Sequence, residues 1–128
     1  MRALLDTHTF LWWVVDAPEL SRAARETIGG GGNDIFFSVV SAWEIVIKFR
    51  LGQLEISESA SAFLIDQVSL NGFGVLPIEM THALQIQDLP SHHRDPFDRM
   101  LVAQSLVENM PLITCDKCIA AYDAPIIW

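Results

Sequence analysis

Acidic side chains recur in this sequence where strands are predicted to end and where helices are predicted to begin. The set consists of Asp6, Glu44, Asp95, Asp98 and Asp116. Carboxylates that lie close together repel one another, which raises their pKa values and costs stability unless a cation lies among them. Mg²⁺ is the expected cation, and Mn²⁺ is a second possibility, because both prefer hard oxygen ligands. One or two such ions can activate a water molecule and stabilise the leaving oxygen of a phosphodiester.

Each carboxylate also has an ordinary structural interpretation, which the sequence leaves open. Three of them precede predicted helices and could serve only as N-caps, namely Asp6, Asp95 and Asp116. Asp98 lies in a first helical turn, where the helix dipole favours a negative charge. Glu44 lies beside the apolar stripe of its helix, and a partly buried carboxylate needs a partner. Lys48, one turn later, could be that partner through an i, i+4 ion pair.

Short apolar segments alternate with amphipathic ones along the chain, which predicts strands alternating with helices. Strands are expected at residues 2–6, 35–38, 74–77, 111–114 and 125–128. Helices are expected at residues 7–15, 22–28, 38–51, 57–69, 81–86 and 96–107, and briefly from residue 117. Thr7 and Ser21 are expected to cap the first two helices. The alternation predicts a three-layer α/β/α fold around a central, mainly parallel sheet of four to five strands. Ligands of such sheets bind outside the C-terminal ends of the strands, where these carboxylates are expected.

The size and composition of the chain limit what it can be. Its 128 residues fit a single domain of residues 1–128, and 51% of them are apolar, which excludes a disordered protein. The longest apolar run, residues 10–15, is far too short to span a bilayer, and no signal peptide is recognisable. The formal net charge of −8 argues against a protein that holds nucleic acid through bulk charge.

The sequence contains two cysteines, Cys115 and Cys118, which lie close together near the C-terminal end. This small number indicates a reducing, cytoplasmic compartment rather than a secreted disulfide scaffold. A thioredoxin-type redox pair would need different neighbours, and a zinc site would need a second pair of ligands at suitable spacing. The two thiols are therefore interpreted as incidental.

The five acids lie within four short segments of the sequence. They are Leu4-Leu5-Asp6-Thr7-His8, Ser38-Val39-Val40-Ser41-Ala42-Trp43-Glu44-Ile45, His93-Arg94-Asp95-Pro96-Phe97-Asp98-Arg99-Met100-Leu101-Val102-Ala103-Gln104 and Leu112-Ile113-Thr114-Cys115-Asp116. In this order and at these separations, the segments resemble those of the PIN-domain ribonucleases, and within them the VapC-type toxins of bacterial toxin–antitoxin pairs. The resemblance extends over nearly the whole chain and implies a PIN-like fold.

The resemblance implies a Mg²⁺-dependent endoribonuclease that cleaves RNA with a metal-activated water. The metal-binding and catalytic quartet would be Asp6, Glu44, Asp98 and Asp116, with Thr114 and Asp95 in supporting roles. Family members use no catalytic histidine, so His8, His92 and His93 are expected to have no chemical role. The expected partners are the RNA substrate, a cognate antitoxin and a second copy of the chain. No association with a membrane is expected.

An RNA substrate must still approach a chain with a surplus of acids. Basic side chains expected near the acidic edge could form a local rim that binds RNA, namely Lys48, Arg50, Arg94, Arg99 and Lys117. Lys48 and Arg99 could instead pair with neighbouring acids. Trp12, Trp13 and Trp43 could stack on RNA bases, but they are expected in the core or at an interface. One of the adjacent pair is expected to face a dimer partner or an antitoxin.

Other functions stay open on the sequence alone. A PIN-domain nuclease of RNA processing would share this site without being a toxin. A non-catalytic PIN-like binding module would be expected to lack one or more of the four acids, and all four are present. A phospho-acceptor receiver domain would need an acidic pair near the first strand, and Asp6 has no acidic neighbour.

Overall fold

Five parallel strands form the central sheet of the computed structural model, which describes residues 1–92 and 94–128. The strands are β1 (Arg2–Leu5), β2 (Asp34–Ser38), β3 (Gly74–Leu76), β4 (Leu112–Ile113) and β5 (Ile126–Ile127). Their order across the sheet is β3-β2-β1-β4-β5, and each pair of neighbours runs parallel. The predicted α/β fold with a central parallel sheet is therefore confirmed.

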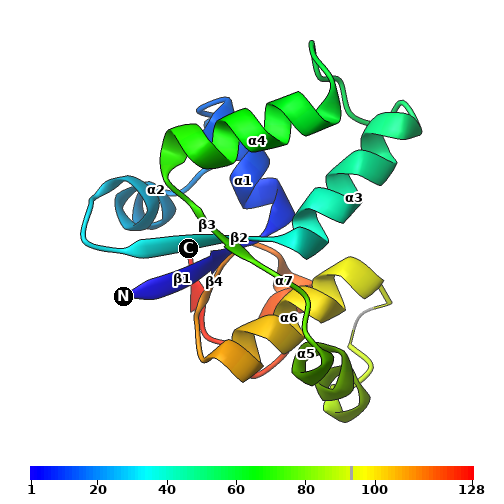
Figure 1. The fold of residues 1–128 in the computed structure, drawn as a ribbon. Helices are drawn as coiled ribbons and strands as arrows, with labels where there is room; N and C mark the ends of the chain where they lie inside the picture. The colour runs from blue at the N-terminus through cyan, green and yellow to red at the C-terminus, as the bar shows by residue number, and fades with distance from the viewer. Residues whose placement is uncertain (93) are drawn as a thin grey trace.

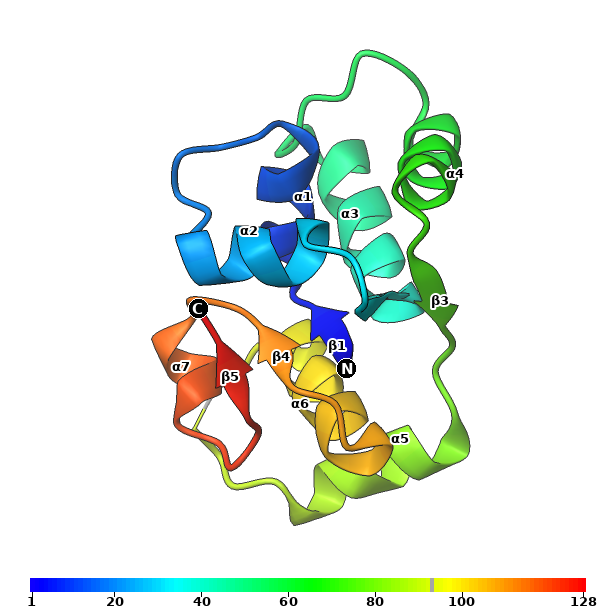
Figure 2. The ribbon, with the colours of Figure 1, turned by 90° about the vertical axis from the view of Figure 1, so that its left-hand side faces the viewer.

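Helices cover both faces of this sheet (Figure 1). They are α1 (Thr7–Val14), α2 (Arg22–Gly29), α3 (Val39–Arg50), α4 (Ala60–Asn71), α5 (Met80–Gln85), the 3₁₀ helix η1 (Ile86–Asp88), α6 (Pro96–Glu108) and α7 (Lys117–Ala120). Helices α1, α2 and α4 lie on one face, and α5, α6 and α7 lie on the other (Figure 2). Helix α3 leaves the end of β2 and contacts both α4 and α6, so it joins the two sides.

Successive side chains of β1 enter two different hydrophobic cores, as the pleat of a strand requires. Ala3 and Leu5 are completely buried in the core that also holds Phe10 and Phe37, whose ring centroids are 4.4 Å apart. Leu4, between them, is completely buried in the core formed with α6 and β4. Burial of a leucine side chain contributes about 1.5–3 kcal/mol. The first strand is thereby fixed on both faces, and the residue that follows it is held in a defined place.

The starts of the helices partly follow the predictions. Ser21 caps α2 as predicted, because its hydroxyl accepts a hydrogen bond of 3.0 Å from the backbone N–H of Ala24. The predicted cap at Thr7 is wrong, since the N-cap position of α1 is Asp6. The predicted start of α4 near residue 57 is also early, because Ser59 caps this helix and it begins at Ala60.

The parallel sheet brings the ends of distant segments to one edge. Asp6 follows β1 directly, α3 starts where β2 ends, and Thr114 follows β4 directly. Strands β1 and β4 are neighbours, with Leu5 paired to Ile113. The side chains that follow these two strands therefore lie next to each other. No helix in the described part of the chain is both long and apolar enough to cross a lipid bilayer.

Candidate active site

Asp6 is buried at the C-terminal edge of the sheet, with 4% of its surface exposed. Its Oδ2 accepts a hydrogen bond of 2.9 Å from the hydroxyl of Thr114. The Thr114 hydroxyl in turn accepts a hydrogen bond of 3.1 Å from the backbone N–H of Asp116. Thr114 thus connects two of the predicted acids, and its supporting role in the site stays a prediction. The second carboxylate oxygen of Asp6, Oδ1, is buried and has no hydrogen-bond partner among the described residues.

The surroundings of Asp6 make its negative charge costly. Burial raises the pKa of the Asp6 carboxyl, and the nearby charge of Asp116 raises it further. The hydrogen bond from Thr114, the charge of His8 and the backbone N–H of Thr7 oppose this rise without cancelling it. A buried carboxylate with a raised pKa and an unpaired oxygen is a group that a cation would stabilise.

Glu44 is a second buried carboxylate, with 3% of its surface exposed, and it lies on α3. Its Oε2 lies 2.7 Å from the ammonium nitrogen of Lys48, one turn later on the same helix. The i, i+4 pairing that the sequence left open is therefore present. Glu44 Oε1 is buried and has no hydrogen-bond partner in the described part of the chain. Burial alone would lower the pKa of Lys48, but Glu44, Asp95 and Asp98 together raise it.

Asp95 and Asp98 stand at the start of α6, across from Lys48. Oδ1 of Asp95 accepts hydrogen bonds from the backbone N–H groups of Phe97 and Asp98, at 2.8 and 3.2 Å, so Asp95 caps this helix. Both carboxylates are close enough to Lys48 to favour its charged form. The ring of Phe97 packs edge-on against Trp43 of α3, with 5.0 Å between their centroids, and this contact holds the two helix starts together.

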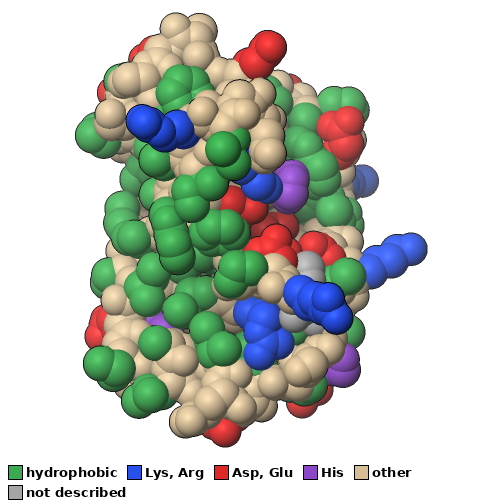
Figure 3. All heavy atoms as spheres, turned by 90° about the vertical axis from the view of Figure 1, so that its right-hand side faces the viewer, with side chains coloured by type: hydrophobic (Ala, Val, Ile, Leu, Met, Phe, Trp, Pro, Cys, Tyr) green, Lys and Arg blue, Asp and Glu red, His purple; other side chains and the backbone are tan. Residues whose placement is uncertain are grey.

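The acids converge on one face of the molecule. Figure 3 shows Asp and Glu side chains gathered in a hollow, with Lys and Arg side chains beside it and apolar side chains on its other side. Asp116 also caps α7, because its Oδ1 accepts a hydrogen bond of 2.8 Å from the N–H of Cys118. Asp95 and Asp116 therefore both serve as N-caps, and their role in a metal site stays a prediction.

The donor set of this hollow fits a hard divalent cation, since it offers carboxylate oxygens and two of them are buried without partners. A preformed cage is not present: among the described residues, no three His, Cys, Asp or Glu side chains are arranged to hold an ion. Several of the carboxylates are held by helix caps or by Lys48. Small side-chain rotations are therefore part of any metal binding here.

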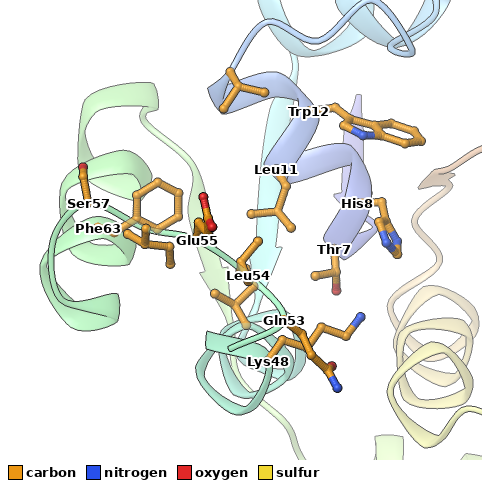
Figure 4. Close-up of a pocket in the computed structure, with 13 residues that line it drawn as sticks. Thr7, His8, Leu11, Trp12, Lys48, Gln53, Leu54, Glu55, Ser57 and Phe63 are labelled. Atoms are coloured by element: carbon orange, nitrogen blue, oxygen red, sulfur yellow. The ribbon is translucent and has the colours of Figure 1, made fainter. Parts of the chain in front are cut away.

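An open pocket of about 640 Å³ adjoins the acids, between α1, α3 and the segment that follows α3. Figure 4 shows Thr7, His8 and Lys48 on one side of this pocket, and Ser57 and Phe63 on the opposite side. Its walls are mainly apolar and include Leu11 and Trp12 of α1. The pocket therefore includes Thr7 and Lys48, which are neighbours of Asp6 and Glu44.

The predicted basic rim is only partly available to a ligand. Arg99 is held within the fold, because its guanidinium donates to the backbone carbonyl of Pro90 at 2.8 Å and to the hydroxyl of Tyr122 at 3.0 Å. Lys48 is paired with Glu44. The remaining members of the predicted rim have exposed side chains, namely Arg50, Arg94 and Lys117.

His8 and Cys115 lie close enough to Asp6 to interact with it electrostatically. His8 is exposed and its ring lies 5.9 Å from that of Trp12, while His92 packs edge-on against Tyr122. His93 lies outside the described residues. Cys115 and Cys118 are both free thiols and exposed. Burial raises the pKa of the Cys115 thiol, and the charges of Asp6 and Asp116 add to the rise.

Two buried hydrogen bonds that support the site were missed in the sequence. The Thr7 hydroxyl donates to Ser41 at 2.8 Å and ties the start of α1 to α3. The Ser38 hydroxyl, which caps α3, donates to Gln104 of α6 at 2.5 Å. Gln104 stands in a run of apolar residues on α6, and an amide in that position was the available signal for a buried polar contact.

Comparison with known proteins places this geometry in a family. The family model described as the PIN domain matches residues 3–125. The chain belongs to the PIN-domain family. PIN domains are nucleases that generally use divalent metal ions. The buried acids at the edge of this PIN domain agree with that chemistry, and the resemblance seen in the sequence is confirmed at the level of the family.

Solved structures share the fold of this PIN domain at low sequence identity. A VapBC2 complex from Rickettsia felis, bound to a DNA fragment from its promoter, aligns with a TM-score of 0.73 and 14% identity, covering 98% of this chain and 97% of that one. FitAcB from Neisseria gonorrhoeae aligns with a TM-score of 0.67 and 18% identity, covering 98% and 96%. Among curated proteins, none matches this chain significantly.

Proposed function

We propose that this PIN domain is a Mg²⁺-dependent endoribonuclease and the VapC-type toxin of a toxin–antitoxin pair, and that Mn²⁺ can replace Mg²⁺. The observation that carries the proposal is Oδ1 of Asp6, a buried carboxylate oxygen without a hydrogen-bond partner among the described residues, in a nuclease fold and linked through Thr114 to Asp116. A buried carboxylate oxygen without a partner is costly in a purely structural role, and a divalent cation removes that cost.

The chain's own residues have distinct roles in the proposed reaction. Asp6 and Asp98 would hold the ion with help from Asp116, and Glu44 would contribute through its ion pair with Lys48. When bound, Mg²⁺ supplies the Lewis acidity that makes water a better nucleophile and offsets charge on the phosphate oxygens. Thr114 fixes the orientation of Asp6 through its hydrogen bond. Asp95 fixes the first turn of α6 and thereby the place of Asp98.

Substitution of Asp6 by Asn tests the nuclease directly. The change keeps the size of the side chain and removes its charge, so we expect Mg²⁺-dependent RNA cleavage to fall by at least about a hundredfold while the circular dichroism spectrum is unchanged. Asp66→Asn, an exposed aspartate on α4, is the matched control and should cleave RNA at the wild-type rate. Wild-type cleavage by Asp6→Asn would show that the site is assigned wrongly.

The toxin role is supported by the relatives whose fold this chain shares, one of which is a VapBC2 complex. The groove next to the acids suits an antitoxin that places apolar side chains against Leu11 and Trp12 and a basic residue over the acids. We expect expression of the chain to arrest growth, and co-expression of an antitoxin encoded beside it to restore growth. RNA cleavage without growth arrest would favour a PIN-domain nuclease of RNA processing instead.

The groove gives the antitoxin proposal a separate test. Trp12→Glu places a negative charge in the groove, so this variant should cleave RNA but escape the antitoxin. Leu84→Glu is the control, because Leu84 is exposed on α5 on the other side of the sheet.

The free thiols Cys115 and Cys118 agree with the cytoplasmic location that this role requires.

A homodimer is the second partnership we propose. Apolar side chains are exposed where α3, α4 and β3 meet, and they line a shallow groove of about 330 Å³ that includes Val39, Ile65 and Val75. Ile65 is 69% exposed and Val75 55%, which is unusual for a patch with no partner. Light scattering should give a dimer for the wild type and a monomer for Ile65→Lys. Leu70→Lys, on α4 but outside this groove, should remain a dimer.

A further inference from the structure

Lys48 places a positive charge inside the acidic hollow before any metal arrives. Its ammonium lies 2.7 Å from Oε2 of Glu44, and its side chain is only 35% exposed. Asp95 and Asp98, on α6, are the other carboxylates whose charges act on it. Lys48 therefore lies among acids from two helices. An exposed ion pair such as that of Arg22 with Glu26 does not lie among further acids in this way.

The acids of the hollow divide into two groups with different cation partners. On the side of β1 and β4, Asp6 and Asp116 are linked by Thr114, and no Lys or Arg is hydrogen-bonded to either carboxylate among the contacts of the described residues. On the side of α3, Glu44 already has an ammonium at contact distance. Asp6 and Asp116 therefore have no cationic side chain hydrogen-bonded to them among the described residues, whereas Glu44 is paired with Lys48.

We propose that Lys48 occupies the place of a second divalent cation, so that this site binds a single metal ion, on the side of Asp6 and Asp116. This proposal rests on the nuclease function proposed above and specifies how many metal ions the nuclease would bind. Sites with two metal ions about 4 Å apart use one ion for the attacking water and the other for the leaving oxygen. Here the ammonium of Lys48 takes the second position.

A lysine is suited to this position because its ammonium is a compact charge with three donors. Glu44 keeps the ammonium in place, and the ammonium keeps Glu44 ionised and fixed although the carboxylate is buried. A phosphodiester that enters the hollow would then meet the ammonium of Lys48 as well as the bound ion. Lys48 is then a positioning residue for the phosphate, and Glu44 acts through it rather than as a second metal ligand.

The number of bound ions tests this inference without any measurement of cleavage. The full chain is freed of metal with a chelator and titrated with Mn²⁺, and the unbound ion is counted by electron paramagnetic resonance. We expect one Mn²⁺ per wild-type chain. We expect two per chain in Lys48→Met, because the change leaves the buried Glu44 carboxylate without its cation. Arg22→Met removes the cation from the exposed i, i+4 pair with Glu26 and should leave the number at one.

Loss of Lys48 alone could unfold the chain, so the inference has a second variant. Glu44→Gln combined with Lys48→Met replaces the buried ion pair by neutral side chains of similar size, and it should bind one Mn²⁺ with an affinity within about threefold of the wild type. Two ions in the wild type, or one ion at wild-type affinity in a folded Lys48→Met, would overturn the inference.

The two proposals can fail separately. RNA cleavage by a wild-type chain that binds two ions would leave the nuclease standing and remove the role of Lys48. One ion in the wild type and two in Lys48→Met, without RNA cleavage in either, would support the cation role of Lys48 and contradict the nuclease.

Discussion

The hydroxyl of Thr114 donates a hydrogen bond of 2.9 Å to Oδ2 of Asp6, a residue 108 positions earlier in the chain. Both side chains are buried, and the Thr114 hydroxyl also receives the backbone N–H of Asp116. One oxygen atom therefore positions two predicted metal ligands. We expect Thr114→Val to lower the free energy of unfolding by about 2 kcal/mol, because a hydrogen bond to a charged group is lost in the interior. Its affinity for Mg²⁺ should fall about tenfold, as measured by calorimetry.

Thr114→Ser separates the hydroxyl from the shape of the side chain. This variant keeps the donor and loses one methyl group, which costs about 1 kcal/mol of stability. Its Mg²⁺ affinity should stay within about twofold of the wild type. If valine and serine at this position bound Mg²⁺ equally well, the hydrogen bond to Asp6 would have no part in holding the metal ligands.

The raised pKa of Asp6 predicts an effect of pH on stability. A carboxyl whose pKa is higher in the folded than in the unfolded chain favours folding only in its protonated form. Its cost is absent at a pH below the unfolded value near 3.8, and it grows as the pH rises through the folded pKa. Asp6→Asn removes this cost, so without divalent ions it should melt at the wild-type temperature at pH 3 and at a higher temperature at pH 7.

Thermal unfolding followed by circular dichroism measures this difference. Each 1 kcal/mol corresponds to about 4 °C for a domain of this size. Mg²⁺ should narrow the gap at pH 7, because the ion stabilises the wild type and not the variant. A melting temperature of Asp6→Asn below that of the wild type at pH 7, in the absence of metal, would contradict the unfavourable charge of Asp6 in the fold.

The order of strands and helices could be predicted because it depends on local patterns. Apolar runs and amphipathic segments alternate along the chain, and the parallel sheet follows from that alternation. The acids at the strand ends were predictable for the same reason, since a parallel sheet brings its C-terminal ends to one edge. The boundary of α4 was not, because Ser57, Ser59 and Ser61 are equally good caps in the sequence and only packing selects Ser59.

Contacts between distant residues decided what the sequence left open. Thr7 is a good cap by type, but its hydroxyl bonds to Ser41, 34 positions away. Arg99 was predicted as part of a rim that binds RNA, and the fold directs it to backbone carbonyls and to Tyr122. Local propensity contains no information about such partners. For Glu44 the sequence did contain a possible partner, Lys48, and the structure shows that the two side chains form an ion pair.

Gln104 links the two helices that carry Glu44 and Asp98. It accepts from the Ser38 hydroxyl at 2.5 Å, and its amide nitrogen donates to the carbonyl oxygen of Pro77 at 3.2 Å. Gln104→Leu would leave the buried Ser38 hydroxyl without an acceptor and remove the donor to the Pro77 carbonyl, so we expect a loss of about 1–3 kcal/mol in the free energy of unfolding by urea. Gln87→Leu, at an exposed position, is the control and should change it by less than about 0.5 kcal/mol.

Gln104 also affects the position of α3, which a second measurement can test. Because Ser38 caps α3, we expect Gln104→Leu to weaken Mg²⁺ binding as well as stability. Gln104→Glu keeps an acceptor for the Ser38 hydroxyl but buries a carboxylate against the Pro77 carbonyl oxygen, so at pH 7 it should be no more stable than the leucine variant. Unchanged stability of Gln104→Leu would show that the link between α3 and α6 carries no energy.

Cys115 can report on metal binding because its thiol lies beside the acids. Burial raises its pKa, and the charges of Asp6 and Asp116 raise it further, so the reactive thiolate is scarce at neutral pH. A cation bound to those carboxylates offsets two of these three causes. In a Cys118→Ser background, Mg²⁺ should therefore speed alkylation of Cys115 by iodoacetamide several-fold at pH 7.5, because the rate follows the thiolate fraction. Asp6→Asn should react faster than the wild type without metal and respond little to Mg²⁺, whereas equal acceleration in both would place the cation away from Asp6.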